Sequence, residues 1–448
     1  MNTSPMTSSN AAGAVRWVVV IAAIALIFDG YDLVVFGTIV STLLADPTQL
    51  GQLDETTAGL LGSYALLGVM VGALSTGAIG DYIGRRKAML TGIVWFSVGM
   101  GLTALAADTL WFGILRFATG MGVGAIVATA GAVVAEFAPK NRRNYYNAIV
   151  YSGVPAGGVL ASLLAMVLSD AIGWRGLFLI GSLPLVFLLP MAWFKLPESP
   201  QWLVSRGRVA EAQETSARTG VVLEIPSGAE ATDLKAERVG FAALATKRYA
   251  LPTALLGMMS FTGLLLTYGL NTWMPEIMQQ AGYGKSHSLL FLLVLNLAAV
   301  FGGLLASMAA DRVGPKQVVA VTFFLAALAM ALMTLKLPLG LLLSLVAVAG
   351  VGTIGTQVLI YGFVSNYYHS AARGAGVAWC AGFGRLGGIF GPLLGGMLLS
   401  AGISPGTAFY VFAAVAIVGT LVTTFVPMAR SAAHRSAQEP LATVGAGK

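Results

Sequence analysis

Charged residues are scarce in this sequence of 448 residues, because Asp, Glu, Lys and Arg make up only 10% of it, whereas soluble domains contain about 25%. Hydrophobic residues make up 57% and gather into long runs. A run of about 20 apolar residues is long enough to cross a bilayer as a helix. The composition therefore excludes an ordinary soluble domain and predicts a membrane protein that crosses the bilayer many times.

Cysteine and histidine are also rare. The single cysteine, Cys380, lies within an apolar run, which excludes an internal disulfide. The histidines, His287, His369 and His434, are not grouped with acidic residues as metal ligands or acid–base catalysts would be. The sequence also lacks a Gly-x-x-x-x-Gly-Lys-Ser/Thr loop for nucleotide phosphates. We therefore expect no metal, no cofactor, no enzymatic activity and no ATP-driven pump.

Twelve apolar runs follow one another, and a polar segment divides them into two sets of six. They predict an all-α membrane protein with twelve transmembrane helices in two pseudo-symmetric halves. The expected units are a tail at 1–16, a first half at 17–199, a linker at 200–248, a second half at 249–428 and a tail at 429–448. The runs cover residues 17–44, 57–80, 88–107, 110–136, 145–169, 175–194, 251–277, 287–310, 317–336, 338–365, 375–400 and 406–427.

Lys and Arg are distributed unevenly between the loops. With the N-terminus inside, the outer loops contain Arg175, Lys285 and Lys336, while Arg116 and Arg385 lie within apolar runs. The other basic residues fall in the tails, the inner loops and the linker, as the positive-inside rule requires. We attribute the formal net charge of +7 to this bias rather than to nucleic-acid binding, and we expect both termini in the cytoplasm.

Two acidic residues, Asp29 and Asp32, interrupt the middle of the first apolar run. A carboxylate at this depth costs roughly 2.5–3.5 kcal/mol on insertion scales, so lipid cannot solvate these side chains. Because they are three residues apart, they share one helix face, which must point into protein or into a water-filled path. Gly30 between them thins the helix and allows a close approach. We expect Asp29 and Asp32 to exchange protons with such a path.

A similar turn follows the second run of each half. In the first half, Asp81 precedes a glycine and the basic residues Arg85 and Arg86. In the second half, Asp311 precedes Arg312, a glycine and a lysine. One such turn would indicate only positive-inside charges, but two at matching places predict an internal duplication and a transporter whose halves rock. The acid of each turn is expected to pair with a neighbouring helix end and to hold the cytoplasmic side shut.

The two arginines inside apolar runs need an anionic partner or a set of carbonyl groups. We expect Arg116 to pair with the Asp29 and Asp32 face or with a substrate carboxylate, and a purely structural ion pair is the alternative. Arg385 lies near the middle of the eleventh run, where no acid of the second half lies at a similar depth. A ligand carboxylate is therefore expected at Arg385, and binding to backbone carbonyls is the alternative.

With its two sets of six helices, its paired Asp turns and its long linker, the chain resembles the major facilitator superfamily. Within it, Asp29-Gly-Tyr-Asp32 resembles the Asp-Gly-X-Asp signature of the aromatic acid:proton symporter family. The segment from Pro197 to Pro200 is similar to one in sugar and organic-ion porters and does not select the substrate. Tyr82, where a basic residue is usual, and Pro315, in place of an arginine, depart from the turn motif and bear on the gate contacts.

The resemblance implies a cavity lined by the first, fourth, seventh and tenth helices. Polar and aromatic groups on these helices are then expected to contact the ring and hydroxyls of a substrate, although aromatic residues near helix ends alternatively anchor at the membrane interface. The expected contacts are Tyr31, Asn271, Trp273, Gln357 and Tyr361, with Tyr268 beside them.

Two further charged residues are expected at the cytoplasmic gate. Glu136, at the inner end of the fourth run, is expected to pair with Arg142 or Arg143, either as part of the gate or as a simple helix cap. Arg373, in the inner loop before the eleventh run, is expected to mirror that turn in the second half.

These features predict a proton-coupled carrier that imports a small organic anion across the bilayer. The resemblance specifies a benzoate-type aromatic acid and the cytoplasmic membrane of a bacterium, and we expect a monomer. A symporter for a sugar or another organic ion of the same superfamily is the alternative. A membrane sensor that binds the acid without moving it is the remote alternative.

Overall fold

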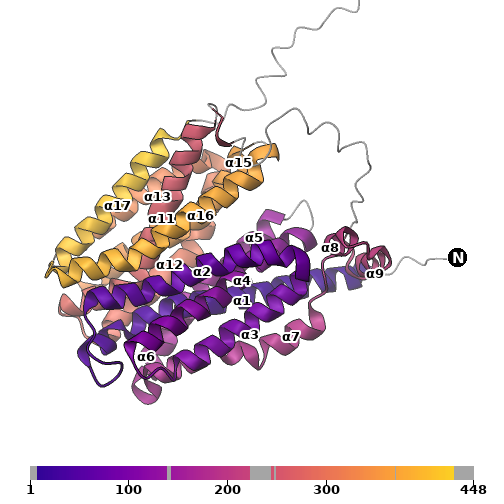
Figure 1. The fold of residues 1–448 in the computed structure, drawn as a ribbon. Coiled ribbons are helices and arrows are strands. Elements are labelled where there is room, and N and C mark those ends of the chain that lie inside the picture. Colours follow the sequence, from indigo (N-terminus) through magenta and orange to yellow (C-terminus); the bar gives the residue numbers. More distant parts are fainter. Residues whose placement is uncertain are drawn as a thin grey trace, which may run out of the picture.

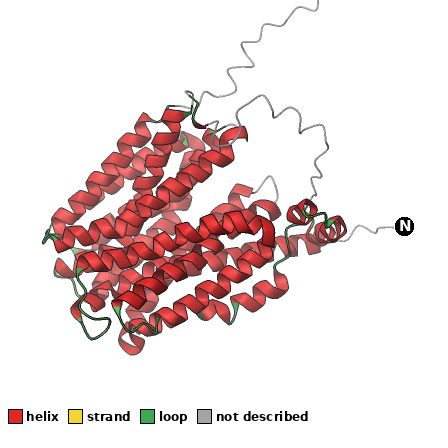
Figure 2. Cartoon of the chain, in the orientation of Figure 1, coloured by secondary structure: helices red, strands yellow, loops and turns green. Residues whose placement is uncertain are grey.

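The computed structural model describes residues 8–138, 143–221, 244–246, 249–335, 337–368 and 370–427. In this part of the chain the regular elements are helices, with no strand (Figure 2). The first half contains α1 (Ser8–Ala45), α2 (Glu55–Ile83), α3 (Arg85–Thr103), α4 (Thr109–Phe137), α5 (Arg143–Tyr151), α6 (Gly153–Ile180) and α7 (Leu188–Lys195). The linker contributes α8 (Pro200–Ser205) and α9 (Val209–Thr219). The second half contains α11 (Ala250–Gln280), α12 (Lys285–Val313), α13 (Pro315–Leu332), α14 (Leu339–Gly350), α15 (Thr356–Tyr367), α16 (Ser370–Ser400) and α17 (Pro405–Phe425).

The predicted all-α membrane fold is confirmed. Among the described residues, ten helical segments are long and apolar enough to cross a membrane. Two less apolar or shorter segments complete the expected series. One is α3, which begins with three basic residues, and the other runs from Trp174 to the end of α7 and includes a short apolar helix. Each of the twelve expected runs therefore falls on helices.

Two of the spans are irregular. Gly173 has φ 62° and ψ −177°, which breaks α6 and separates the fifth predicted run from the sixth. A positive φ of this kind favours glycine, which has no Cβ. In the tenth run a π-helical turn at Val351–Gly355 joins α14 to α15. Such turns are often found at functional sites, and this one ends two residues before Gln357, an expected substrate contact.

The helices form two bundles that follow the two halves of the sequence (Figure 1). In the first bundle α2 and α3 pack on α4, and α1 packs on α6. In the second, α11 packs on α16 and α13 on α17. The bundles meet through three helix pairs, α2 with α16, α6 with α12 and α1 with α11. The interface between the halves is therefore formed by helices of both, as a rocking transporter requires.

The halves are joined most closely at one end. We call the end with α8, α9, Gly84 and Gly314 the linker end. At the opposite end, a Cβ added to Gly37 of α1 would overlap the backbone of Asn271 in α11, and one added to Gly59 of α2 would lie 2.7 Å from the Pro392 oxygen in α16. Toward the linker end, α5 and α15 diverge (Figure 1). The described conformation is therefore closed at the end opposite the linker.

Gly30, between the two acids of α1, allows a backbone-to-backbone contact inside the first half. A Cβ at Gly30 would overlap the carbonyl oxygen of Val154 in α6, and one at Gly157 of α6 would overlap the carbonyl oxygen of Ile27. The expected close approach at Gly30 is thus present. It fixes the depth and rotation of α1, and with them the direction of both carboxyl groups.

Replacing Gly30 by alanine should therefore destabilise the protein by about 1–3 kcal/mol, because the methyl group must push α1 away from α6. Gly77→Ala is the matched control, since Gly77 also lies in a helix but an added Cβ would find open space. Thermal melting of the detergent-solubilised protein measures both. Equal melting temperatures for the two variants would show that the α1–α6 contact can adapt.

Candidate functional site

A buried ion pair joins α1 to α4 inside the first half. Arg116 donates from Nη1 to Asp32 Oδ1, and the side chains are 1% and 0% exposed. The Arg116 guanidinium also lies 5.3 Å from the ring centre of Phe36 and 5.7 Å from that of Phe178. Of the alternatives for Arg116, the structure has the pair with the helix-1 acids. Because the Asp32 carboxylate already neutralises the charge of Arg116, Arg116 is less suited than an unpaired arginine to bind a substrate carboxylate.

Asp29 has a different environment from Asp32, although both lie on α1. Asp29 is 4% exposed, and its Oδ1 has no hydrogen-bond partner among the described residues. The charge that attracts ionised Asp29 most strongly is that of Arg385, on α16 in the other half. The described contacts include no direct ion pair between them. Asp29 is therefore a buried carboxyl group that interacts electrostatically with a cation of the other half.

Arg385 is surrounded by tyrosines from both halves. Its Nη1 donates to Tyr268 Oη of α11 over 3.3 Å. Tyr361 of α15 and Tyr151 of α5 also lie close enough to interact electrostatically with the guanidinium. We call Asp29, Arg385, Tyr151, Tyr268 and Tyr361 the Arg385 cluster. It combines one acid, one base and three phenols from both bundles, which suits the binding of a carboxylate attached to a polar ring.

Tyr151 was not found from the sequence. It ends α5 in a tyrosine-rich stretch, where a tyrosine is readily interpreted as an interfacial anchor. In the fold its hydroxyl lies 2.7 Å from the position that a Cβ on Gly131 of α4 would take. The available signal was weak: a phenol within an apolar run, facing a helix that presents a glycine.

Tyr31 and Trp273 have packing contacts within their own halves. The Tyr31 hydroxyl donates to the backbone oxygen of Leu177 over 2.7 Å, and the Trp273 indole donates to that of Pro392 over 2.7 Å. Both side chains are 0% exposed. These contacts tie α1 to α6 and α11 to α16. These contacts give both residues a structural role, and the expected substrate contacts of Tyr31 and Trp273 stay predictions.

Asn271 and Gln357 lie on buried polar networks. Asn271 Oδ1 accepts from Asn296 Nδ2 over 2.8 Å, which links α11 to α12. Gln357 donates from Nε2 to Ser260 Oγ over 3.2 Å, but its buried Oε1 has no partner in the described part of the chain. A buried acceptor without a donor is costly, so Gln357 is suited to accept a hydrogen bond from a ligand.

The expected gate residues lie at the linker end, and several lie outside the described structure. Arg142 is not among the described residues, nor are the side chains of Asp81, Arg143 and Arg373. Glu136, at the end of α4, pairs with Arg85 Nε at 3.7 Å, at the start of α3. The predicted pair of Glu136 with Arg142 or Arg143 lies outside the described residues and stays a prediction.

For Arg86, Asp311 and Arg312, the described contacts include none between the two halves. The backbone N–H of Arg86 donates to Glu198 Oε1 over 3.0 Å, a contact within the first half. Asp311 and Arg312 are exposed at the end of α12. In the described residues no group of acidic, histidine and cysteine side chains is arranged to hold a metal ion.

Comparison with known proteins agrees with this architecture. The family model of the Major Facilitator Superfamily matches residues 22–371 and 291–446. The gentisate transporter of Corynebacterium glutamicum is 34% identical over 399 residues, covering 88% of this chain and 84% of that protein. The benzoate transport protein of Acinetobacter baylyi is 32% identical over 436 residues, covering 94% and 91%. A crystal structure of a D-xylose–proton symporter has the same fold, with a TM-score of 0.73 at 19% identity, covering 93% of this chain and 98% of that one.

Two six-helix halves around a partly buried charge cluster define a secondary transporter rather than an enzyme. The chain belongs to the Major Facilitator Superfamily, among its aromatic acid transporters.

Proposed function

We propose that this protein is a proton-coupled symporter that imports a small aromatic carboxylate, of the benzoate or hydroxybenzoate type, by alternating access. The observation that carries the proposal is the Arg385 cluster, in which Asp29 of one half is buried, Arg385 of the other is partly buried, and no ion pair between them is described. The two relatives described above, named for gentisate and benzoate, support this class of substrate.

The substrate carboxylate would bind at Arg385. One guanidinium nitrogen is held by Tyr268, and hydrogen bonds from the others to a carboxylate would be charge-assisted. The three phenols of the cluster offer rings to pack on the substrate ring and hydroxyls to bond its substituents. Gln357 and Asn271 provide further polar groups in the second half. Arg116 would act indirectly, by keeping Asp32 ionised and paired.

Coupling follows from the placement of Asp29. While Asp29 is ionised, it competes with a substrate anion for Arg385. When Asp29 takes up a proton, the attraction ends and Arg385 is available to the substrate. Proton and anion together then leave no unmatched charge in the cluster, so the halves can close around it at low cost. With only one of the two bound, a bare buried charge opposes closure.

The orientation of the carrier is part of the proposal. We infer that the linker end faces the cytoplasm of a bacterium, with both termini inside, because Lys and Arg concentrate in the segments at that end. The described conformation would then be inward-facing, since its halves are closed at the opposite end. One chain contains both halves, and we propose a monomer. The proposed gate at the linker end consists of Asp81, Arg85, Arg86, Glu136, Arg142, Asp311, Arg312 and Arg373.

Replacing Arg385 by alanine should weaken binding of benzoate about 10- to 100-fold, because a charge-assisted hydrogen bond to a carboxylate contributes roughly 1.5–3 kcal/mol. Binding of benzamide, which has the same ring but no charge, should change much less. Binding of both ligands to the purified protein measures the difference, with Arg16→Ala, an exposed arginine near the start of α1, as control. An equal loss for both ligands would assign Arg385 a packing role instead.

Uptake into proteoliposomes tests the substrate class. A panel of benzoates and xylose, measured with and without an uncoupler, should show accumulation of the aromatic acids that the uncoupler abolishes. Accumulation of xylose alone would favour the sugar symporter. Binding of an aromatic acid without counterflow would favour a sensor.

A further inference from the structure

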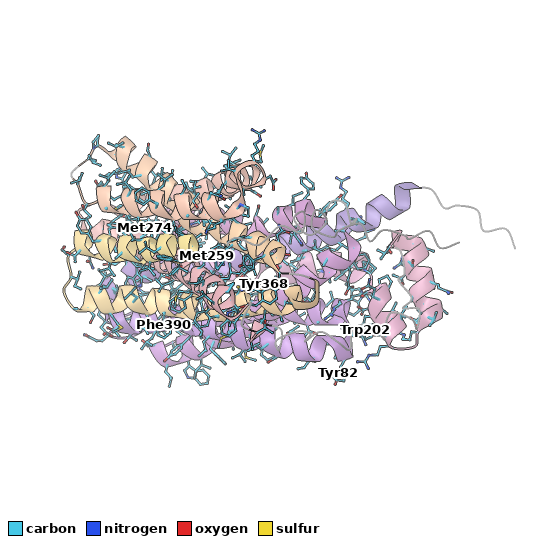
Figure 3. All side chains as sticks on the ribbon, turned by 90° about the horizontal axis from the view of Figure 1, so that it is seen from above. Tyr82, Trp202, Met259, Met274, Tyr368 and Phe390 are labelled. Carbon is cyan, nitrogen blue, oxygen red and sulfur yellow. The ribbon has the colours of Figure 1, made fainter. Side chains whose placement is uncertain are left out.

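A second site lies outside the Arg385 cluster, where the linker helices meet the first half. It is a pocket of about 420 Å³ between the start of α3, the end of α7, and α8 and α9. Figure 3 labels Tyr82 of α2 and Trp202 of α8 in this region. The Arg206 guanidinium lies 5.2 Å from the ring centre of Tyr82 and 6.0 Å from that of Trp202. Arg206, which follows α8, therefore contacts the end of the membrane-spanning helix α2 beside the pocket.

The charges that line the pocket do not cancel. Four cationic and two acidic side chains line it: Arg86, Lys87, Arg208, Arg218, Glu198 and Glu211. Glu211 is paired with Arg208. Glu198 accepts from the Arg86 backbone at the start of α3 but keeps its charge, so the lining has two more positive than negative charges. The hydrogen bond from Arg208 also lowers the pKa of Glu211, which keeps that pair ionised and matched. The remaining cations are Arg86, Lys87 and Arg218.

Each of these three cations has hydrogen-bond donors without an acceptor among the described residues. The buried Nε of Arg86 has no partner in the described structure, although its Nη2 donates to the Trp193 oxygen. Lys87 and Arg218 are exposed, and the described residues offer neither of them a hydrogen bond or an ion pair. One face of the pocket thus presents unmatched guanidinium and ammonium donors, the groups that bind phosphate.

The pocket is bordered by aromatic side chains at the end of a membrane-spanning segment. Phe194, which lines it, is 80% exposed, and Trp193 beside it is 58% exposed. Exposed aromatic residues at helix ends are typical of the headgroup level of a bilayer. The phosphate donors and the lipid surface are therefore next to each other.

We propose that this pocket binds a phosphate group, and that the headgroup of an acidic phospholipid supplies it. Binding there would attach the linker helices to the membrane surface beside the gate. The site is independent of the transported substrate, since its residues belong to the pocket and not to the Arg385 cluster.

Lipid binding to the purified full-length protein, measured by native mass spectrometry, tests the proposal. Phosphatidylglycerol should be retained in preference to phosphatidylcholine. The double variant Lys87→Gln/Arg218→Gln should weaken phosphatidylglycerol binding at least about tenfold, because each basic residue near an acidic headgroup contributes on the order of 1 kcal/mol. Arg312→Gln, an exposed arginine at the end of α12 outside the pocket, is the matched control.

A competition arm identifies the source of the phosphate. Glycerol phosphate in solution should displace phosphatidylglycerol only at high concentration; tight binding of glycerol phosphate by itself would assign the site to a soluble phosphate compound instead. Equal retention of the two lipids by the wild type, or an equal loss in the double variant and in Arg312→Gln, would overturn the proposed site. Neither result depends on transport activity.

Discussion

Asp29→Asn is expected to abolish accumulation of an aromatic acid driven by a pH gradient, while the protein remains folded. Asparagine keeps the shape of the side chain but cannot take up and release the proton. The Oδ1 atom of Asp29 has no described partner that the change would remove, so the loss should be one of coupling rather than of stability. A gradient of one pH unit is worth about 1.4 kcal/mol, or tenfold accumulation, for each coupled proton.

Proteoliposomes with an imposed pH gradient measure this effect. The wild type should concentrate the acid about tenfold per pH unit if one proton is coupled, and Asp29→Asn should not concentrate it at all. Asp170→Asn is the matched control, because Asp170 is a largely exposed acid paired with Lys285 at the opposite end. Concentrative uptake by Asp29→Asn at the wild-type level would refute the proton assignment.

Asp32→Asn, unlike Asp29→Asn, should greatly lower the stability of the folded protein. The substitution leaves the guanidinium of Arg116 buried and without its counter-charge, and arginine cannot escape by losing a proton. Removing one partner of a buried ion pair costs about 3–5 kcal/mol, which for a membrane carrier means a much lower melting temperature and a low yield.

The double variant Asp32→Asn/Arg116→Gln separates the charge effect from a general packing defect. Removing both charges should recover most of the lost stability, because two polar neutral groups replace the pair. Melting temperatures of the two single variants, the double variant and Asp29→Asn complete the comparison. A double variant that is no more stable than Asp32→Asn would show that the pair does not act as an electrostatic unit.

The sequence predicted most of the fold because the bilayer imposes one dominant constraint. Run length and the positions of Lys and Arg sufficed for two halves of six helices. The break at Gly173 and the π-helical turn at Val351–Gly355 were not predicted. Both lie inside apolar runs. Hydropathy predicts the length of such a run, but it does not predict where the α-helical hydrogen-bond pattern is interrupted.

The site was predicted in part, for a similar reason. A charge in the membrane must have a partner, so Asp29, Asp32, Arg116 and Arg385 stood out from the sequence. Which acid pairs with which base depends on helix rotation, which the Gly30–Val154 contact sets and the sequence does not reveal.

Aromatic residues gave a weaker signal. Tyr31 and Tyr151 both occur within apolar runs, yet the hydroxyl of Tyr31 bonds the backbone of α6 whereas Tyr151 joins the Arg385 cluster. When a helix is apolar on all sides, its sequence does not indicate which face points toward the Arg385 cluster.

Infrared difference spectroscopy of the purified carrier tests most directly whether Asp29 holds the coupled proton. As the pH is lowered, the wild type should show the carbonyl band of a protonated carboxylic acid, and added benzoate should strengthen that band at fixed pH. The band should be absent from Asp29→Asn and present in Asp170→Asn. A band that persists unchanged in Asp29→Asn would contradict the central role of this carboxyl group.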